Sequence, residues 1–546
     1  MKKSTFLQGT IVASFSFILV KVIGVLYVIP FNAIIGEDGG ALYSFGYNIY
    51  ALFLSVSTAG IPYAMAKVIS EYNALGYENA KDAAYKLGRN ILFGISVIAF
   101  LIMFIFAKPL AHMMIGDDAV TTSSADVVFV IRCISTAILV IPFLSVTKGY
   151  LQGHKFITPI SASQIIEQLV RVAIILVGSY VFMILLNWGL KITIGVSMFG
   201  ATFGGLVAAI YLKRKIHKGK EHFLCENKVG ESHINSKDIL KKIILYAIPF
   251  IITAVSVNLY TFIDMVLLVR TMGDILNYDP EITTTVTAVY STWASKLFLI
   301  VVSFSAGLSM SLLPNIVDSY AKGEIHDINS KYNKALQMIL IFIVPLTIFL
   351  SIFSKEIWTL FYGESQYGPL IFKVYIFSAI ANSFYVLNND MAQGMNKFKM
   401  VYWSIGIGIG LNIVLDVPFM ILSYKLGFQV AYGAVVASAL SMMIAFFIGA
   451  AYFKKREKFK YKETIALLPK ILVGIIIFVA VALVAREVIG IESQSRLMQI
   501  VILGVYGIIT FGVYGIAVYF MGTLKALLGE FDIANRLKSR KNPKND

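Results

Sequence analysis

The strongest constraint on this chain is a series of long apolar runs separated by short polar connections. About 20 consecutive apolar residues are enough to cross the hydrocarbon core of a bilayer as a helix. Only 14% of the 546 residues are charged, whereas soluble domains carry about 25%. The sequence therefore predicts an integral membrane protein. Roughly fourteen runs are long enough, near 8–35, 41–70, 89–110, 125–150, 160–184, 190–212, 240–270, 284–317, 331–353, 368–393, 399–424, 429–453, 464–486 and 496–521.

These spanning segments are expected to be α-helices. Backbone amides in lipid must be hydrogen-bonded within the protein, and the runs are too long and too continuously apolar for the strands of a barrel. The predicted fold class is therefore an all-α polytopic membrane protein with about 14 transmembrane helices.

Lysine and arginine gather in every second connection, which predicts the orientation. The connections at 213–242 and 454–462 and the tail at 536–544 are basic, while those at 37–38 and 274–281 are acidic. Cytoplasmic connections carry the excess of positive charge, so both termini are expected in the cytoplasm. This topology accounts for the net charge of +16, and no nucleic-acid partner is expected.

The two halves of the chain repeat weakly, which predicts two lobes of six helices related by a pseudo-two-fold axis. Ala59-Gly60, Gly76 and Tyr85 recur at the same spacing as Ala306-Gly307, Gly323 and Tyr332. Chance similarity among small residues is the alternative. Transporters built from parallel repeats bind their substrates between the halves. The expected division is an N-lobe at 1–215, a cytoplasmic linker at 216–239, a C-lobe at 240–455, and two further helices with a basic tail at 456–546.

Several charges of the first half lie inside predicted spans. A lysine at mid-membrane costs about 2.5–3.5 kcal/mol on insertion scales, so Lys21 is expected to face a cavity and attract an anion. Snorkelling or pairing with a carboxylate is the alternative. Arg132, Glu167 and Arg171 are also within spans, and the four-residue spacing of Glu167 and Arg171 allows them simply to pair. In the second half, Lys296 is a further cation that can reach the cavity.

The acidic residues within the spans of the second half are candidates for a cation site. Asn412 lies one helical turn before Asp416, so both leave the helix on the same side. Together with Asp264 they offer hard oxygen ligands for a small cation or a proton. Na⁺ or H⁺ is therefore the expected coupling ion. Pairing of Asp264 or Asp416 with Arg270 or Lys296 is the alternative.

The sequence also has helix-breaking prolines inside its spans and lacks the motifs of common soluble enzymes. Pro30, Pro62 and Pro249 fall inside spans, and they indicate either ordinary kinks or bends that let the lobes open and close. The sequence GIGIG at 406–410 lies in an apolar helix and predicts close helix packing. Walker A, GxSxG and HExxH motifs are absent from the sequence. We therefore expect a transporter driven by an ion gradient or a membrane potential, without a cofactor, and not an enzyme.

One stretch resembles a known family. GYLQGHKFITPISASQIIEQLVRV at 149–172, which contains Gly153, resembles the helix 4–helix 5 signature of the polysaccharide-transport branch of the multidrug/oligosaccharidyl-lipid/polysaccharide exporter superfamily. KVIGVLYVIPFNAIIG from Lys21, AGIPYAMAKVISEYNALG from Ala59 and AGLSMSLLPNIVDSYAKG from Ala306 support it. Within that branch the chain looks most like the lipid II flippases of the MurJ/YtgP type and the sporulation protein SpoVB.

The resemblance implies a fold like that of the MATE transporters and a pyrophosphate-binding cavity between the lobes. Lys21 and Lys296 match basic family positions in helices 1 and 8, and Arg132 and Arg171 complete our candidate set. The chain departs from the family at Tyr27-Val28, where an Arg-Asp pair is expected, and near Leu54 or Ser55, where an arginine is expected. The resemblance also implies a sodium site at Asp264, Asn412 and Asp416, with Ser438 as a further ligand.

The resulting functional hypothesis is a flippase of the bacterial plasma membrane. It would move an undecaprenyl-pyrophosphate-linked precursor, foremost lipid II, from the cytoplasmic to the outer leaflet. We expect it to act as a monomer beside the cell-wall synthesis machinery. A flippase for a teichoic-acid or capsule precursor and a multidrug or cation antiporter are the alternatives. A membrane-embedded glycosyltransferase or ligase would need catalytic groups in a large external loop, and the outer loops are short.

Overall fold

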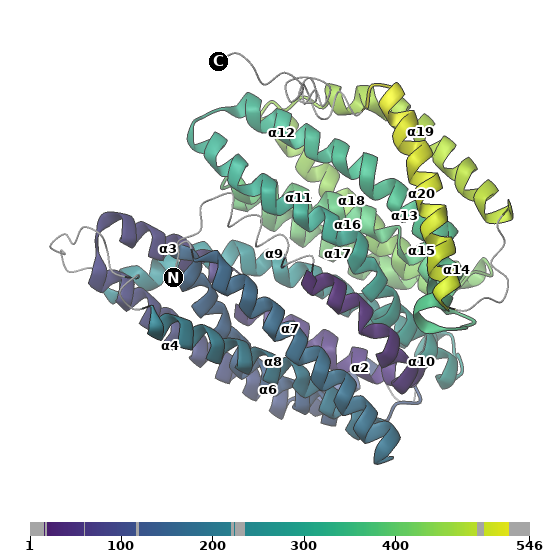
Figure 1. The fold of residues 1–546 in the computed structure, drawn as a ribbon, viewed down its shortest axis with the longest axis horizontal. Coiled ribbons are helices and arrows are strands. Elements are labelled where there is room, and N and C mark those ends of the chain that lie inside the picture. Colours follow the sequence, from purple (N-terminus) through teal and green to yellow (C-terminus); the bar gives the residue numbers. More distant parts are fainter. Residues whose placement is uncertain are drawn as a thin grey trace, which may run out of the picture.

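The computed structural model describes residues 16, 19–58, 60–115, 120–154, 156–219, 223, 235–488 and 496–523. All regular elements in this part of the chain are helical, and Figure 1 shows them gathered into two lobes. The fold class predicted from the sequence is thereby confirmed. Most of the predicted linker at 216–239 and the basic end of the tail lie outside the described residues.

The first lobe, purple to blue in Figure 1, is formed by the first seven α-helices of the element order. A π-helical turn extends the sixth of them. Their bounds are α2 Val28–Thr58, α3 Ile61–Leu75, α4 Glu78–Ile105, α5 Ala107–Ile115, α6 Ser124–Gly153, α7 Ile157–Ser179 with η1 Tyr180–Leu185, and α8 Leu190–Lys218.

The second lobe is teal to green in Figure 1, and the last two helices lie along its outer side. Its bounds are α9 Ser236–Arg270, η3 Thr271–Ile275, α10 Pro280–Ala288, η4 Val289–Ala294, α11 Ser295–Ala321, α12 Ile325–Met338, η5 Ile339–Ile343, α13 Val344–Ile352, α14 Ser354–Tyr362, α15 Gly368–Tyr375, α16 Ser378–Gly394, α17 Phe398–Lys425 and α18 Val430–Arg456. The outer pair is α19 Lys462–Val488 and α20 Arg496–Phe520.

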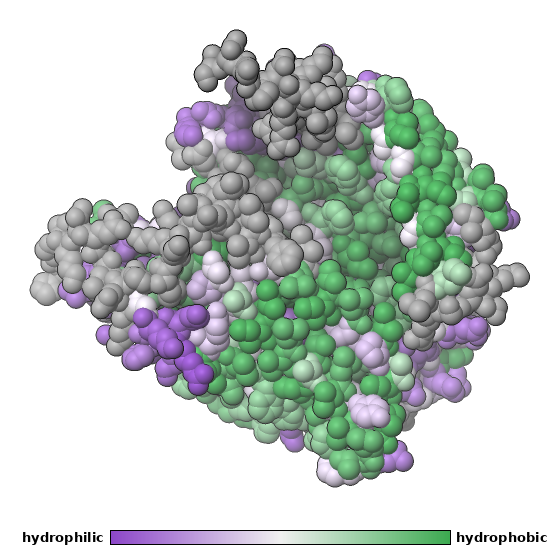
Figure 2. Space-filling view, in the orientation of Figure 1, coloured by the Kyte–Doolittle hydropathy of each residue, from purple (hydrophilic) through white to green (hydrophobic). Residues whose placement is uncertain are grey.

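Twelve helices of the described part are long and apolar enough to cross a membrane, and a bent pair, Leu19–Leu26 and Val28–Val56, adds a thirteenth at an angle of 42°. The predicted number of fourteen is therefore approximate, and the start of the predicted span 8–35 lies outside the described residues. Figure 2 shows apolar surface along the sides of both lobes, with hydrophilic residues at the ends of the helices. This distribution is that of a polytopic membrane protein.

The predicted span 41–70 is not one continuous helix. Gly60 has a φ of 75°, a left-handed conformation that favours glycine, and it separates α2 from α3. Pro62 lies in the first turn of α3, where its missing N–H sacrifices no helical hydrogen bond. Pro62 thus begins a helix rather than bending one, whereas Pro249 is buried inside α9 and Pro30 is exposed on α2. A hinge role for these prolines stays a prediction.

The sequence repeat corresponds to matching helix ends. Gly76 and Gly323 both have a φ of 74° just after a helix. The dipeptide Gln152-Gly153 recurs as Gln393-Gly394, and the two glycines are the last residues of α6 and α16. The match fails at one position, because α11 continues through the residue equivalent to Gly60. The helix of the first lobe is therefore broken where its counterpart is continuous.

The lobes are joined at the end that carries the acidic connections. Thr292 Oγ1 donates to the carbonyl oxygen of Gly40 at 2.7 Å, and the backbone N–H of Thr121 donates to Thr284 Oγ1 at 2.9 Å. A Cβ atom on Gly40 would lie 2.5 Å from Trp293 Nε1, so the two lobes touch closely there. Toward the opposite end, marked by α3 and α12 in Figure 1, the lobes diverge. α9 lies between them and contacts α2 and α3 on one side and α17 on the other.

Close packing in the GIGIG stretch is confined to its middle glycine. A Cβ atom on Gly408 would lie 2.3 Å from the hydroxyl of Tyr260, whereas nothing lies within 4 Å of a Cβ on Gly406 or Gly410. Gly408→Ala is expected to destabilise the protein by about 1–3 kcal/mol, because Tyr260 is buried and must move. Gly406→Ala and Gly410→Ala are the controls and should be neutral or slightly stabilising. Thermal unfolding in detergent measures this, and equal effects at all three positions would contradict the packing argument.

Candidate functional site

The four residues predicted to bind a cation meet in one buried cluster of the second lobe. Asp264 comes from α9, Asn412 and Asp416 from α17, and Ser438 from α18. None of the four is more than 5% exposed. The side-chain nitrogen of Asn412 donates to Asp264 Oδ1 at 3.0 Å and to Asp416 Oδ1 at 3.1 Å. Ser438 Oγ lies 2.8 and 2.7 Å from the two carboxylate oxygens of Asp264.

Tyr290 belongs to the same cluster and was not predicted from the sequence. Its hydroxyl donates to Asp264 Oδ2 at 2.8 Å, and the residue is 2% exposed. Tyr290 lies in η4, the π-helical turn at 289–294. Its only sequence signal is a phenol within a span, and the chain has 29 tyrosines. Spacing along the chain therefore could not have selected it.

The chemistry of this donor set fits a monovalent cation or protons. Asp416 Oδ2 and Asn412 Oδ1 are buried and have no hydrogen-bond partner among the described residues. Leaving such acceptors unpaired in a low-dielectric interior is costly, and a small cation or a proton would satisfy them. The alternative pairings with Arg270 and Lys296 are not formed in the described structure. Arg270 pairs with Asp274 at 3.0 Å, and Lys296 lies elsewhere.

Lys296 belongs to a second group, which joins the two lobes. Its ammonium lies over the ring of Tyr47 on α2, 4.8 Å from the ring centroid. Tyr47 stacks in turn on Tyr43 with ring centroids 5.6 Å apart. Lys21 and Arg171 also lie within electrostatic reach of the Tyr47 hydroxyl. One of the four predicted pyrophosphate ligands, Lys296, thus contacts this tyrosine at the boundary between the lobes, and two more, Lys21 and Arg171, interact with it electrostatically.

Glu167 is the carboxylate bound to this group. It pairs with Arg171 at 2.8 Å, as the four-residue spacing predicts, and with Lys148 at 2.9 Å. The pairing does not exclude a ligand role for Arg171, because one carboxylate is shared between Arg171 and Lys148. Lys296 forms no ion pair with another described residue, so the region around Tyr47 carries positive charge that suits an anionic ligand.

Arg132 is not brought into this group. Its side chain is exposed, its Nε donates to the carbonyl oxygen of Phe104 at 3.3 Å, and its guanidinium lies 5.2 Å from the centre of the Phe104 ring.

Gly153, a residue of the family-like stretch, has a packing role. A Cβ atom there would lie 2.7 Å from Ile69 Cβ and 2.9 Å from the carbonyl oxygen of Ala66, so α6 and α3 approach closely at this position.

One short segment touches both groups and the junction of the lobes. Within the seven residues 290–296, Tyr290 binds Asp264 of the cation cluster and Lys296 lies over Tyr47. Thr292 and Trp293, between them, pack on Gly40 of the first lobe. These residues belong to η4 and the first turn of α11, so one continuous helical segment reaches all three partners.

The chain is similar to proteins of known families. The family model described as polysaccharide biosynthesis protein matches residues 6–319, and the MatE model matches 249–417. The lipid II flippase MurJ of Bacillus subtilis (strain 168) is 30% identical over 537 residues, which cover 96% of this chain and 97% of that protein. Stage V sporulation protein B of the same organism is 22% identical over 68% of this chain and 69% of its own length.

Solved structures share the fold. The lipid II flippase MurJ in an inward closed conformation superimposes with a TM-score of 0.64 at 17% identity, covering 93% of this chain and 98% of that one. An inward-facing multidrug resistance transporter of the MATE family gives 0.63 at 13% identity, covering 82% and 99%. The predicted MATE-like arrangement of helices is thereby confirmed.

Proposed function

Because this chain belongs to the polysaccharide biosynthesis protein family, and to the branch of its superfamily that includes the MurJ lipid II flippase of Bacillus subtilis, we propose that it moves lipid-linked cell-wall precursors across the plasma membrane. Membership confirms the resemblance noted in the sequence. It also makes the protein a transporter and not an enzyme. Its cytoplasmic termini, its monomeric state and its association with cell-wall synthesis machinery stay predictions.

The proposed cargo is lipid II, carried from the cytoplasmic to the outer leaflet. The observation that supports an anionic cargo is the group of Lys21, Arg171 and Lys296 around Tyr47. Hydrogen bonds between ammonium or guanidinium groups and phosphate oxygens are strong, and they gain further strength away from bulk water. A pyrophosphate held there lies where the lobes meet, so their relative movement changes the side from which it can be reached.

We propose that cation binding at Asp264, Asn412, Asp416 and Ser438 drives the cycle. A bound Na⁺ or H⁺ can do this only if it favours one arrangement of the lobes over the other. Asp264 is held by Tyr290, which lies on the same helical segment as Lys296. A change in the cation cluster can therefore alter the site proposed for the pyrophosphate.

A multidrug or cation antiporter fits this geometry less well. The excess of lysine and arginine around Tyr47 would repel a cationic drug, whereas it attracts a pyrophosphate. A flippase for a teichoic-acid or capsule precursor would present the same pyrophosphate to the same residues, and only the saccharide would differ.

Depletion of the protein tests both the activity and the cargo. We expect undecaprenyl-linked lipid II to accumulate in the cytoplasmic leaflet, as measured by mass spectrometry of extracted lipids and by an accessibility assay on each side of the membrane. Expression of the wild-type protein from a plasmid is the control and should reverse the accumulation. Accumulation of a different undecaprenyl-linked saccharide would contradict the cargo, and accumulation of none would contradict the flippase.

A further inference from the structure

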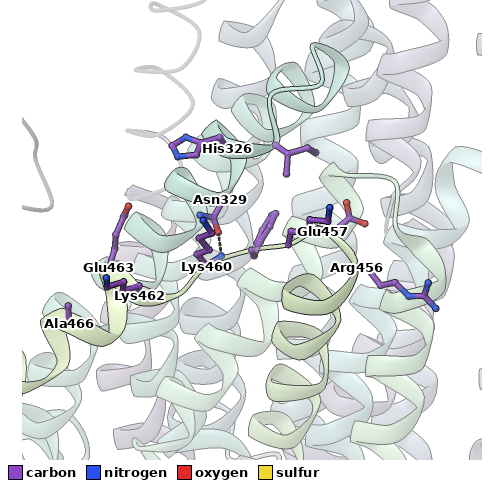
Figure 3. A pocket seen from close by; sticks show the side chains of 11 residues that line it. His326, Asn329, Arg456, Glu457, Lys460, Lys462, Glu463 and Ala466 are labelled. Atoms are coloured by element: carbon purple, nitrogen blue, oxygen red, sulfur yellow. Dashed lines mark hydrogen bonds between the residues drawn. The ribbon is translucent and has the colours of Figure 1, made fainter.

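A basic groove lies where α12, α18 and α19 meet, and none of its lining residues belongs to the two groups described above. It encloses about 740 Å³, and Figure 3 shows the side chains that line it. Arg456, Lys458, Lys460 and Lys462 all line this groove and are exposed. None of the four forms an ion pair with another described residue. The groove therefore has a cluster of uncompensated positive charge at its surface.

The acidic residues of the groove do not cancel this charge. Glu457 pairs with Lys397, on the connection between α16 and α17, at 2.7 Å. Glu463 is then the one described carboxylate of the lining that remains available. Four cations against one carboxylate leave a strong preference for an anionic ligand.

The connection that carries these lysines, residues 457–461, has a fixed shape. Phe459 is 2% exposed and stacks on Phe453, with ring centroids 5.3 Å apart. The backbone N–H of Lys460 donates to Asn329 Oδ1 at 3.0 Å, a bond drawn in Figure 3. Asn333 Nδ2 donates to the carbonyl oxygen of Lys460 at 2.8 Å. The backbone is thus held to α12 and α18, which leaves the lysine side chains to interact with a ligand.

Lys458 has a backbone conformation that disfavours lysine. Its φ is 59°, in the left-handed region, and the other described non-glycine residues with positive φ are Asn187, Asn277 and Asn396. Asparagine is enriched in this region because its short side chain tolerates it. Three positions therefore carry a residue suited to the backbone, whereas Lys458 does not. The backbone conformation therefore does not explain a lysine at this position, whereas a role for the charged side chain does.

We propose that this groove binds the phosphate headgroup of an anionic phospholipid of the surrounding leaflet. A lipid fits better than a free anion because apolar surface continues from the groove along α19. Ala466 lines the groove, and Ile465 and Leu468 beside it are 61% and 42% exposed. Lysines in a connection next to a membrane-spanning helix attract anionic headgroups. The inference depends on neither the cargo nor the coupling cation proposed above.

The test uses purified full-length protein in a neutral detergent, with thermal unfolding followed during titration with phosphatidylglycerol. We expect phosphatidylglycerol to raise the Tm, and phosphatidylcholine or inorganic phosphate to leave it unchanged. Lys458→Asn removes the charge and suits the backbone. We therefore expect it to unfold at the same or a higher temperature without lipid, while about fivefold more phosphatidylglycerol is needed for the half-maximal shift. This combination separates loss of binding from loss of folding.

Lys455→Gln is the matched control. It also removes one positive charge, and it is exposed in the last turn of α18 without lining the groove. Its response to phosphatidylglycerol should equal that of the wild type. If Lys455→Gln and Lys458→Asn weaken the response to phosphatidylglycerol equally, the lipid acts through general electrostatic attraction and not at this groove. A Tm shift by inorganic phosphate alone would mean that the groove binds a free anion. Either result would overturn the proposal.

Discussion

Lys296→Ala is expected to abolish growth of a strain that depends on this protein, although the variant still inserts and folds. Lys296 lies over Tyr47 at the junction of the lobes, and Lys21 and Arg171 lie within reach of the same tyrosine. Loss of one hydrogen bond to a charged group costs about 1.5–3 kcal/mol, which is roughly a 10- to 100-fold loss of affinity. Complementation of a depleted strain and lipid II transport into reconstituted vesicles measure the effect.

Lys21→Ala should have the same effect, and Lys21→Arg should retain function because the charge is kept. If Lys21 and Lys296 bind one pyrophosphate, the double alanine variant should lose less than the sum of the two single losses. Arg132→Ala is the control, since its exposed side chain packs on Phe104, and it should complement fully. Normal growth with Lys296→Ala, or additive losses in the double variant, would contradict a shared anion site.

Asp264→Asn and Asp416→Asn are expected to remove the stabilisation of the protein by the proposed coupling cation. A ligand present at about 100 times its dissociation constant stabilises the folded state by about 2.7 kcal/mol. Each substitution preserves the size of the side chain but removes a negative charge from the cluster around Asn412 and Ser438. Cargo binding should persist while the return between lobe arrangements fails. Thermal unfolding in Na⁺ compared with K⁺, and across pH, measures the site.

Asp274→Asn is the matched control for these variants. It makes the same chemical change just beyond α9, where Asp274 pairs with Arg270, and it should leave the dependence on Na⁺ or pH intact. The coupling hypothesis fails if the wild-type protein shows neither dependence. It also fails if Asp264→Asn and Asp416→Asn keep the wild-type response.

The membrane fold could be predicted from the sequence because apolar length and helical backbone bonding leave few choices in lipid. The pairing of Glu167 with Arg171, and the common side of Asn412 and Asp416, follow from helical geometry within a single segment. The meeting of Asp264 with Asp416 does not follow from helical geometry, since these residues come from helices far apart in the chain. It was expected from the chemistry of their oxygen ligands and from the family resemblance.

Other features depended on tertiary contacts that a single sequence does not contain. Tyr290 and Tyr47 are two of many tyrosines, and their importance arises from which side chains lie against them. Arg132 has a side chain suited to bind a phosphate, but its position on α6 places it on an exposed face of the helix. The break at Gly60 was missed because α3 begins at once on the other side of it, which leaves the apolar pattern almost continuous.

The segment from Tyr290 to Lys296 has a thermodynamic consequence. Its ends touch the proposed cation cluster and the proposed pyrophosphate group, and its middle packs on the opposite lobe. Coupling between two binding sites is reciprocal, because both orders of binding lead to the same final complex. Whatever factor the cation imposes on cargo affinity, the cargo imposes on cation affinity. Coupling between the two proposed sites through this segment would therefore be reciprocal, so that binding of the lipid would change how tightly the ion is held.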